Sequence, residues 1–372
     1  MKLLIFVGTL AAVTDAFSSS PSGLNLHHSV KFSGYHYSTG YASKGSRSAL
    51  MIPLPSNDKF LEMSSSQSDE KSMDDKDNDD KMAKKVVGRK KRVVVGYLLT
   101  SALYLLTTVM ATIMLFKQQV NISRLAYFSS GNVLAGGLAL ILKDAAVNDR
   151  LRSDTYKRLN LFTAWYGFLM SIITVKIFKP PQLLLVTNLI AMINSIKGYG
   201  YGAKGWTLRE GVPFSEDLVQ GVKSTIRGMF RTFPKDVKSA GYLLGTAVAK
   251  TLTIFKFIEI INIFLGGGDS ITFLSATRLH RCSKLCLLSV CMYTLKDAAD
   301  RDRLDGTTFI QLNFLSSLVW ASMLGYILYQ NPWAILGTKS TLKPTVTAAL
   351  AGFFALFTAG NGIVSIAGKE KA

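Results

Sequence analysis

The feature that most constrains this chain is a 19-residue stretch that occurs twice. Residues 142–160 read LKDAAVNDRLRSDTYKRLN, and residues 295–313 read LKDAADRDRLDGTTFIQLN. Without any gap, 11 of the 19 positions are identical, where average composition would match about one. Each copy joins two apolar runs. An internal repeat of this kind predicts a duplicated structural unit.

Apolar runs long enough to cross a membrane lie on both sides of each copy. The chain is 48% hydrophobic with a mean hydropathy of +0.25, and its apolar residues come in blocks, which indicates membrane spans rather than a soluble core. The sequence predicts an all-α polytopic membrane protein of two parallel four-helix repeats, about eight transmembrane helices. The predicted spans are residues 93–116, 125–142, 161–178, 183–196, 241–265, 279–295, 314–329 and 344–366.

The charges predict the orientation of these spans. Four spans per unit put both units in the same direction, with a pseudo-two-fold axis along the membrane normal. The net charge is +19, and most Lys and Arg residues flank apolar runs, as the positive-inside rule describes. The N-terminal region, both repeat loops and the central linker are therefore expected on one side. This use of basic residues favours the lipid bilayer as partner and no nucleic acid.

The N-terminus has the features of a targeting leader. Residues 1–16 combine Lys2 with a short apolar core, as a signal peptide does, and residues 17–50 contain no Asp or Glu and have transit-peptide composition. The sequence Asp-Ala-Phe-Ser at positions 15–18 resembles the bipartite plastid presequence of algae with complex plastids, such as diatoms. The resemblance is confined to the leader and implies a plastid membrane. The alternative is a membrane of the secretory pathway.

The rest of the chain divides by composition. A charged segment with few large apolar residues, predicted to be disordered, precedes the first membrane unit, and a linker joins the two units. The predicted segments are residues 51–92 (charged segment), 93–196 (membrane unit 1), 197–240 (linker) and 241–372 (membrane unit 2).

The linker contains a predicted basic amphipathic helix over residues 215–233. Lys223, Arg227 and Arg231 share one face at a spacing of four, and apolar residues line another. Such a helix lies flat on a membrane and contacts anionic lipid. The other interpretation is a soluble helix packed on the repeat loops.

Charged residues inside the fifth predicted span form the best candidate for an intramembrane polar site. Lys256 and Glu259 are three residues apart and share a helix face, with Lys250 earlier in the same span. Charged groups at membrane depth are costly and usually face a bundle interior. The pair therefore either lines a transport path or stabilises the span as an ion pair.

The repeat loops supply a second group of candidate polar residues. We expect them to pair across the pseudo-axis, either locking the interface or forming a vestibule for an anion or ion. The residues are Asp144, Arg150 and Asn160 in the first copy and Asp297, Arg303 and Asn313 in the second.

No motif in the chain indicates catalysis. There is no Gly-rich phosphate loop, HExxH, CxxC or Gly-x-Ser-x-Gly sequence. Cys282, Cys286 and Cys291 fall in one predicted span without the further ligands of a zinc site. We therefore expect no catalytic residue, no metal and no cofactor, and we do not expect an enzyme. Two functions remain: a small-solute or ion transporter, or a structural or assembly factor that binds a partner or anionic lipid.

Phe17 tests the targeting prediction. If the leader is bipartite, the Phe17→Ala variant should fail to reach the plastid, because the aromatic residue after the signal peptide is what the resemblance marks as essential. Fluorescent tagging of the full chain, of this variant and of a chain lacking residues 1–50 measures this. Unchanged plastid import of the variant contradicts the prediction.

Overall fold

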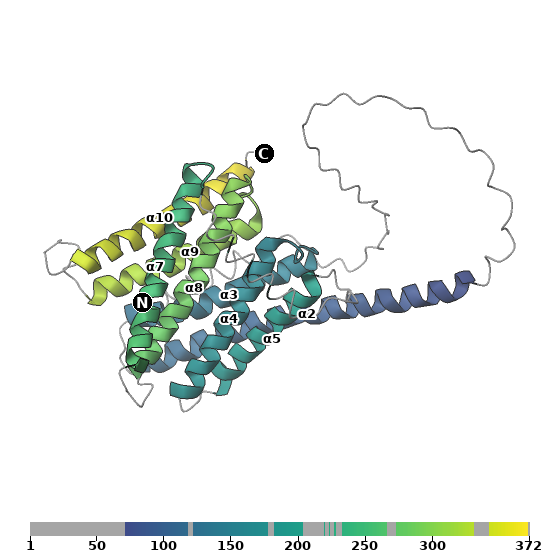
Figure 1. Ribbon diagram of the computed structural model, residues 1–372, viewed down its shortest axis with the longest axis horizontal. Coiled ribbons are helices and arrows are strands. Elements are labelled where there is room, and N and C mark those ends of the chain that lie inside the picture. The colour runs from purple at the N-terminus through teal and green to yellow at the C-terminus, as the bar shows by residue number, and fades with distance from the viewer. Residues whose placement is uncertain are drawn as a thin grey trace, which may run out of the picture. The chain divides into compact units, whose positions relative to one another are not determined.

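The computed structural model describes residues 71–117, 122–177, 182–203, 233–265, 273–330 and 342–370, together with positions 219, 223 and 227. All regular elements in these ranges are α-helices, and each predicted span corresponds to one of them (Figure 1). In chain order they are α2 (Lys71–Lys117), α3 (Ile122–Val147), α4 (Asp154–Ile177), α5 (Gln182–Ala203), α7 (Val237–Leu265), α8 (Phe273–Asp300), α9 (Thr307–Gln330) and α10 (Leu342–Glu370).

Five of these helices are long and apolar enough to cross a membrane. Their apolar stretches are Val86–Ile113, Ser129–Val147, Leu183–Gly200, Thr307–Gln330 and Pro344–Gly368. The other three predicted spans, in α4, α7 and α8, form helices of suitable length, but each of these helices carries four or more charged residues. The chain is an all-α polytopic membrane protein.

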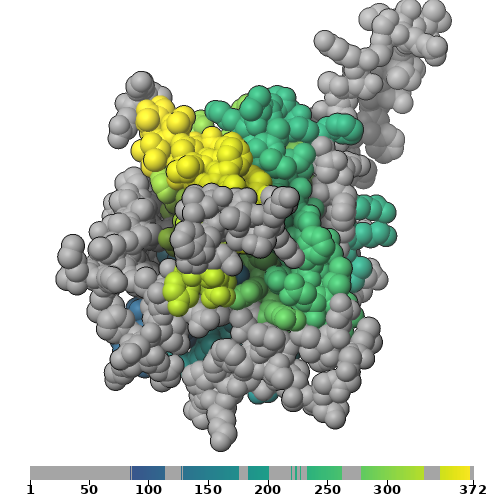
Figure 2. All heavy atoms as spheres, turned by 90° about the vertical axis from the view of Figure 1, so that its left-hand side faces the viewer, coloured from purple at the N-terminus to yellow at the C-terminus, as the bar shows by residue number. Residues whose placement is uncertain are grey.

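The outer surface of the second unit is apolar where lipid would touch it. Figure 2 shows the face on which α7 and α10 lie beside each other. Ile254 and Phe255 of α7 are each 59% exposed, and Leu356 of α10 is 77% exposed. Large apolar side chains presented outward over whole helices are what a bilayer requires of a spanning segment.

The two repeat loops have the same backbone structure. Asp149 and Asp302, equivalent positions of the repeat, are the non-glycine residues with positive φ in the described chain, both at 53°. The following amides close the turn in the same way: Arg150 N donates to Ala145 O at 2.8 Å, and Arg303 N donates to Ala298 O at 2.9 Å. Aspartate tolerates this left-handed conformation better than most residues. Each loop therefore ends one helix and starts the next within six residues.

A second, shorter repeat shows that α7 is the counterpart of α2. Gly-Tyr-Leu-Leu occurs at residues 96–99 and again at 241–244. The Tyr97 hydroxyl donates a hydrogen bond to Asn160 Oδ1, and the Tyr242 hydroxyl donates to Asn313 Oδ1 at 2.8 Å. Both asparagines are fully buried. The first helix of each unit is thus tied to the third by the same pair of side chains.

The units are related by a two-fold axis that runs along their hairpins. Helix α3 packs against α9, and α4 packs against α8 (Figure 1). Because α3 is equivalent to α8 and α4 is equivalent to α9, these two contacts are equivalent to each other. The two loops lie at the same end, where Tyr156 Oη and Thr308 Oγ1 are 2.9 Å apart. The hairpins therefore run in parallel, as two four-helix repeats of one orientation require.

Two helix ends lie elsewhere than the predicted segment boundaries. The segment 51–92 is helical from Lys71, because α2 continues upstream of its apolar part. Residues 71–92 contain no Pro, and Gly88 is their one Gly. Each residue that extends a formed helix adds a hydrogen bond. The predicted linker begins at 197, but α5 continues to Ala203. There Gly198 contacts Tyr97 so closely that a Cβ would clash with its ring.

Other predictions fall outside the described residues. These are the signal peptide, the transit-peptide-like segment, and most of the amphipathic helix 215–233, including Arg231. Within that helix Lys223 and Arg227 are described, and both are helical and exposed.

Arg152 and Asp305 test the parallel arrangement. They occupy equivalent, exposed positions of the two loops. Arg152→Cys and Asp305→Cys, in a chain whose three native cysteines are replaced by Ala, should react with an impermeant thiol reagent from the same side of sealed membranes. Lys179→Cys, in the connection between α4 and α5, is the opposite-side control. Labelling of the two loop cysteines from opposite sides would exclude parallel units.

Candidate functional site

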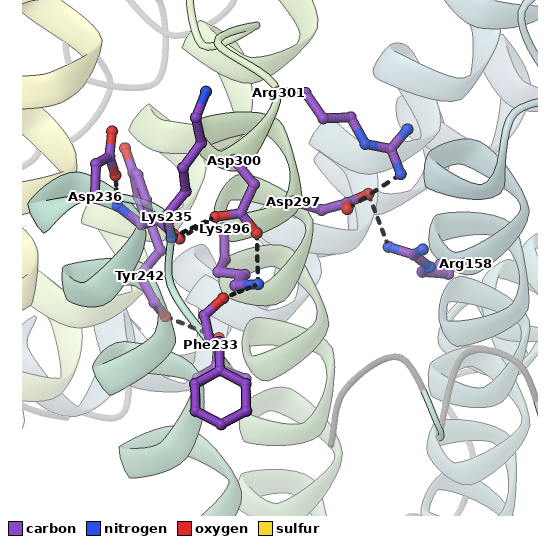
Figure 3. Close-up of polar contacts among 11 residues, drawn as sticks. Arg158, Phe233, Lys235, Asp236, Tyr242, Lys296, Asp297, Asp300 and Arg301 are labelled. Carbon is purple, nitrogen blue, oxygen red and sulfur yellow. Dashed lines mark hydrogen bonds and ion pairs between the residues drawn. The ribbon is translucent and has the colours of Figure 1, made fainter. Parts of the chain in front are cut away.

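Polar contacts join the two units at their loop end. Asp297 Oδ2 accepts from Arg158 Nη1 of the first unit at 3.2 Å, and Asp297 Oδ1 accepts from Arg301, just after the end of α8, at 3.2 Å (Figure 3). The Arg158–Asp297 bridge is largely shielded, with side-chain exposures of 11% and 17%. Together with Tyr156 and Thr308, this ion pair closes the interface at this end.

The predicted cross-axis pairs are formed by other partners. Asp297 crosses to Arg158 rather than to Arg150, and Asp144 pairs with its neighbour Lys143 at 2.9 Å. Arg150 and Arg303 follow the left-handed aspartates in the tight turns and are exposed, so they point away from the interface. Asn160 and Asn313 contact the tyrosines of their own units and not each other. The loop residues thus lie near the axis, and the partners that the structure gives Asp144, Asp297, Asn160 and Asn313 differ from the cross-axis pairs that we expected.

An equivalent lysine holds each left-handed aspartate. Lys90 Nζ lies 2.7 Å from Asp149 Oδ2, and Lys235 Nζ lies 2.7 Å from Asp302 Oδ2. Each lysine stands seven residues before the tyrosine of the shorter repeat. The hydrogen bond to Asp302 raises the pKa of Lys235. These groups are largely exposed, so each pair adds little stability. Lys90 belongs to α2 and Lys235 lies two residues before α7, so each pair connects the beginning of a unit to its repeat loop.

Asp300 organises the loop end of the second unit. Its carboxylate accepts from Ser239 Oγ at 2.5 Å and from Lys235 N at 3.2 Å, and Lys296 Nζ lies 2.5 Å away (Figure 3). Burial raises the pKa of Asp300, but the bonds from Lys296 and Ser239 outweigh it, so its pKa lies below the ordinary 3.8. Its stabilising contribution is present above pH 3.8 and is lost as the pH falls through the lowered pKa.

The predicted intramembrane residues of α7 form an ion pair. Lys256 Nζ lies 2.7 Å and 2.9 Å from the two carboxylate oxygens of Glu259. Arg278 of α8 adds a second cation, with Nε 3.6 Å from Glu259 Oε2. The three side chains are between 27% and 37% exposed. Lys250 lies earlier on α7 and is half-buried.

Sequence reasoning missed the most buried charged residue of the bundle, Lys284 of α8. Its residue is 0% exposed. Its ammonium group donates to Tyr127 O at 2.7 Å and to Ser130 Oγ at 3.2 Å, and it lies 3.1 Å from the centroid of the Tyr127 ring. These partners belong to α3 of the other unit, and none is an acid. The Lys284 amine is therefore held at the interface between the units by neutral groups.

Lys284 also lies close to the pseudo-axis. Its equivalent position in the first unit is Gly131, because the repeat offset is 153 residues. A Cβ built on Gly131 would lie 3.5 Å from Lys284 Cδ and 2.7 Å from Tyr166 Oη. Equivalent residues that meet must lie near a two-fold axis. The glycine leaves room for the lysine stem at this point.

Arg281 and His280 surround Lys284 on the same helix. The Arg281 guanidinium donates to Tyr326 Oη at 2.6 Å and lies over the rings of Tyr127 and Tyr326, which stack at 4.5 Å. Its Nε is buried without a hydrogen-bond partner. His280 Nδ1 lies 3.2 Å from Met170 Sδ of α4. We name Tyr127, His280, Arg281, Lys284 and Tyr326 the axial cation cluster.

The sequence did contain a signal for this cluster. Lys284 lies inside the predicted span 279–295, so the rule that singled out Lys256 applies to it equally. Arg278, Arg281 and Lys284 recur every three residues, which places them along one side of α8. The contact with Gly131 and the burial could not be read from the sequence, because they depend on how the two units meet.

Metal ligation finds no support in the part of the chain that the structure describes. No group of three or more His, Cys, Asp or Glu side chains is placed to hold a metal ion there. The cysteines of α8 are unpaired, with Cys282 and Cys291 buried. No family model, curated protein or solved structure matches the chain.

The Lys256–Glu259–Arg278 group makes a testable prediction. Glu259→Leu leaves two cations without their carboxylate, whereas Lys256→Met leaves Glu259 with Arg278. Glu259→Leu should therefore lower the melting temperature in detergent more than Lys256→Met does. The loss should lie between the ~0–1 kcal/mol of an exposed pair and the ~3–5 kcal/mol of breaking a buried one.

The double variant Lys256→Met/Glu259→Leu is the control for this prediction. It removes one cation together with the carboxylate, so it should be more stable than Glu259→Leu alone. If all three variants melt at the same temperature as the wild type, the pair contributes nothing to stability and the lysine reaches the interface independently.

Proposed function

We propose that this protein transports a small solute or ion across a plastid membrane, and that its two repeats form the path between them. The observation that supports this proposal is Lys284, a fully buried cation at the interface of the units. Insertion scales put a lysine at the centre of a span at about 2.5–3.5 kcal/mol. A charge kept inside a membrane bundle at this cost marks a functional site by default.

The symmetry supports the same location. In transporters built from repeats, the binding site lies between the repeats near the middle of the membrane, and access alternates as one repeat rocks against the other. Lys284 is 16 residues from Asp300, or about 24 Å along α8, and 11 residues, about 16 Å, from Phe273. The cation is therefore well inside the bundle from either end.

The loop end would then be the closed side of the path. Arg158–Asp297 and Tyr156–Thr308 join the units there, and any rocking that opened this side would break both contacts. The ion pair and the hydrogen bond are each modest in strength, which suits an interface that separates and reforms during a transport cycle.

The plastid location rests on the leader. Its signal-peptide-like start, the Phe17 junction and the acid-free segment that follows resemble a bipartite plastid presequence. The basic residues of the N-terminal region and loops would then face the stroma.

A structural or assembly role is the second candidate, and one observation favours it. The units pack closely at their interface: a Cβ on Gly137 of α3 would meet Leu315 of α9 at 2.6 Å. Small residues that bring membrane helices together stabilise a fixed interface. In such a protein Lys284 would serve only to hold α8 against α3.

Reconstitution separates the two candidates. Proteoliposomes are challenged with osmotic gradients of potassium chloride, nitrate, acetate and phosphate in the presence of valinomycin, and with glycerol and glucose, and swelling is followed by light scattering. Transport predicts faster swelling than in protein-free vesicles for at least one solute. Lys284→Met should remove that acceleration, while Lys197→Met, an exposed lysine of α5, should keep it.

The outcomes are exclusive. No acceleration with any of these solutes would overturn the transport proposal and favour the structural role. Acceleration that survives Lys284→Met in a correctly folded variant would show that the buried lysine is not part of the path. Helix content and elution in size-exclusion chromatography establish the folding of each variant.

A further inference from the structure

We propose that the axial cation cluster binds a small oxyanion, a group of the carboxylate, nitrate or phosphate type. The proposal deepens the proposed function, since it names the class of solute that the path would carry. It rests on four observations: uncompensated charge, unused donors, a preorganised guanidinium and an ordered row of cations.

The charge of the cluster is uncompensated within the described chain. Arg281 contacts a phenol and two aromatic rings, and Lys284 contacts a main-chain oxygen, a hydroxyl and a ring. Neither forms an ion pair with a described carboxylate. Glu259, the acidic residue of α7, is already bound by Lys256 and Arg278. Arg281 is partly exposed and Lys284 is fully buried, so an anion between them is screened by less solvent than at the protein surface and is attracted more strongly.

The donors of the cluster are not fully used. Arg281 Nε is buried and has no acceptor, and an unsatisfied buried donor destabilises the empty site. Lys284 has three N–H groups, of which two donate to Tyr127 O and Ser130 Oγ. Arg281 Nε is thus available to an incoming oxygen atom, and an oxygen atom that binds Lys284 would compete with its contact to the Tyr127 ring, 3.1 Å away.

The guanidinium is held in a fixed plane. Tyr127 and Tyr326 stack on each other, and Arg281 lies over both rings at 5.4 Å and 4.9 Å from their centroids. A fixed guanidinium fork matches the two oxygens of a carboxylate, nitrate or phosphate better than it matches a spherical halide. The chemistry therefore favours oxyanions over chloride.

The cations of α8 also provide a route to the cluster. Arg278, Arg281 and Lys284 follow one another at intervals of three residues, and exposure falls from 29% for the Arg278 side chain to 0% for Lys284. Arg278 lies toward the end of α8 that is remote from the repeat loops. A row of cations of decreasing exposure draws an anion inward. The site is thus reached from the end opposite the closed loop interface.

The close packing around Lys284 limits the size of the anion. Beside Lys284, a single Cβ at Gly131 would already crowd Tyr166 Oη. Binding of an anion therefore requires the packed side chains or the two units to move apart, and an anion of a few heavy atoms requires less movement than a bulky phosphorylated metabolite.

Thermal melting of the purified full chain in detergent tests this proposal directly. Sodium nitrate, acetate or phosphate is titrated against sodium chloride at constant ionic strength. At least one oxyanion should raise the melting temperature saturably, and chloride should not. Lys284→Met should abolish the shift, and Arg281→Lys, which keeps the charge but loses the fork, should weaken apparent affinity at least tenfold. Lys197→Met should bind as the wild type does.

The outcomes separate this inference from the proposed function. Saturable oxyanion binding without any uptake in proteoliposomes would keep the site and overturn transport. Uptake of glycerol or glucose alone, with no faster swelling in any potassium salt, would support transport and contradict the inference. The inference also fails if no oxyanion shifts the melting temperature, or if the shift is unchanged in Arg281→Lys, which tests the site even where Lys284→Met does not fold.

A lipid headgroup carries the same oxyanion chemistry, and one arm of the experiment distinguishes it. Short-chain phosphatidylglycerol is titrated beside free phosphate. Stabilisation by the lipid, with none by any free oxyanion, would show that the cluster binds a lipid and would contradict the proposal that it binds a transported oxyanion. Stabilisation by free oxyanions that the lipid does not reproduce supports the proposal.

Discussion

The structure depends on a tight helix-to-helix turn that is built twice around a left-handed aspartate. A non-glycine residue in this conformation costs roughly 1–2 kcal/mol, so the surroundings of Asp149 and Asp302 must stabilise it. The lysine that pairs with each aspartate contributes, and its positive charge also lies at the C-terminal end of α3 or α8, where the helix dipole favours a cation. Because both turns have one geometry, the two hairpins have one shape and pack as equals about an axis.

Polar side chains hold the helices together inside each unit. Tyr97–Asn160 and Tyr242–Asn313 are buried hydrogen bonds between the first and third helices. In lipid, where water cannot compete, such bonds specify which helices associate and in what register. The two asparagines have Nδ2 groups without a partner among the described residues. The free-energy cost of the unpaired Nδ2 group is thus the same in both units. It is offset because the Oδ1 atom of each amide holds the tyrosine, and with it the first helix, in place.

Duplication and divergence act at different places in the molecule. The two loops remain alike because their tight turn, with its left-handed aspartate, can be formed by few sequences. The interface near the axis has diverged, and there the two-fold geometry makes identity unfavourable: a residue on the axis meets its own equivalent, and two buried lysines would repel. Lys284 facing Gly131 resolves this conflict, with the small residue leaving space for the long one. The asymmetric contact between Arg158 and Asp297 follows the same pattern, since the equivalent of Arg158 is the neutral Gln311. A symmetric ancestor would thus gain a single cationic site by changing only one half.

The sequence by itself determined the long apolar helices that the structure describes and the duplication, because apolar run length, the repeat and the turn residues are local properties of the chain. It also indicated Lys256 with Glu259, since two charges one turn apart on a helix need no tertiary information to meet. Only the tertiary structure decided that Asp297 pairs with Arg158, that Asn160 binds Tyr97, and that Lys284 is buried on the axis. Each of those depends on which face of one helix is turned toward another segment far away in sequence, and that choice is made by packing of the whole bundle, which no local pattern encodes.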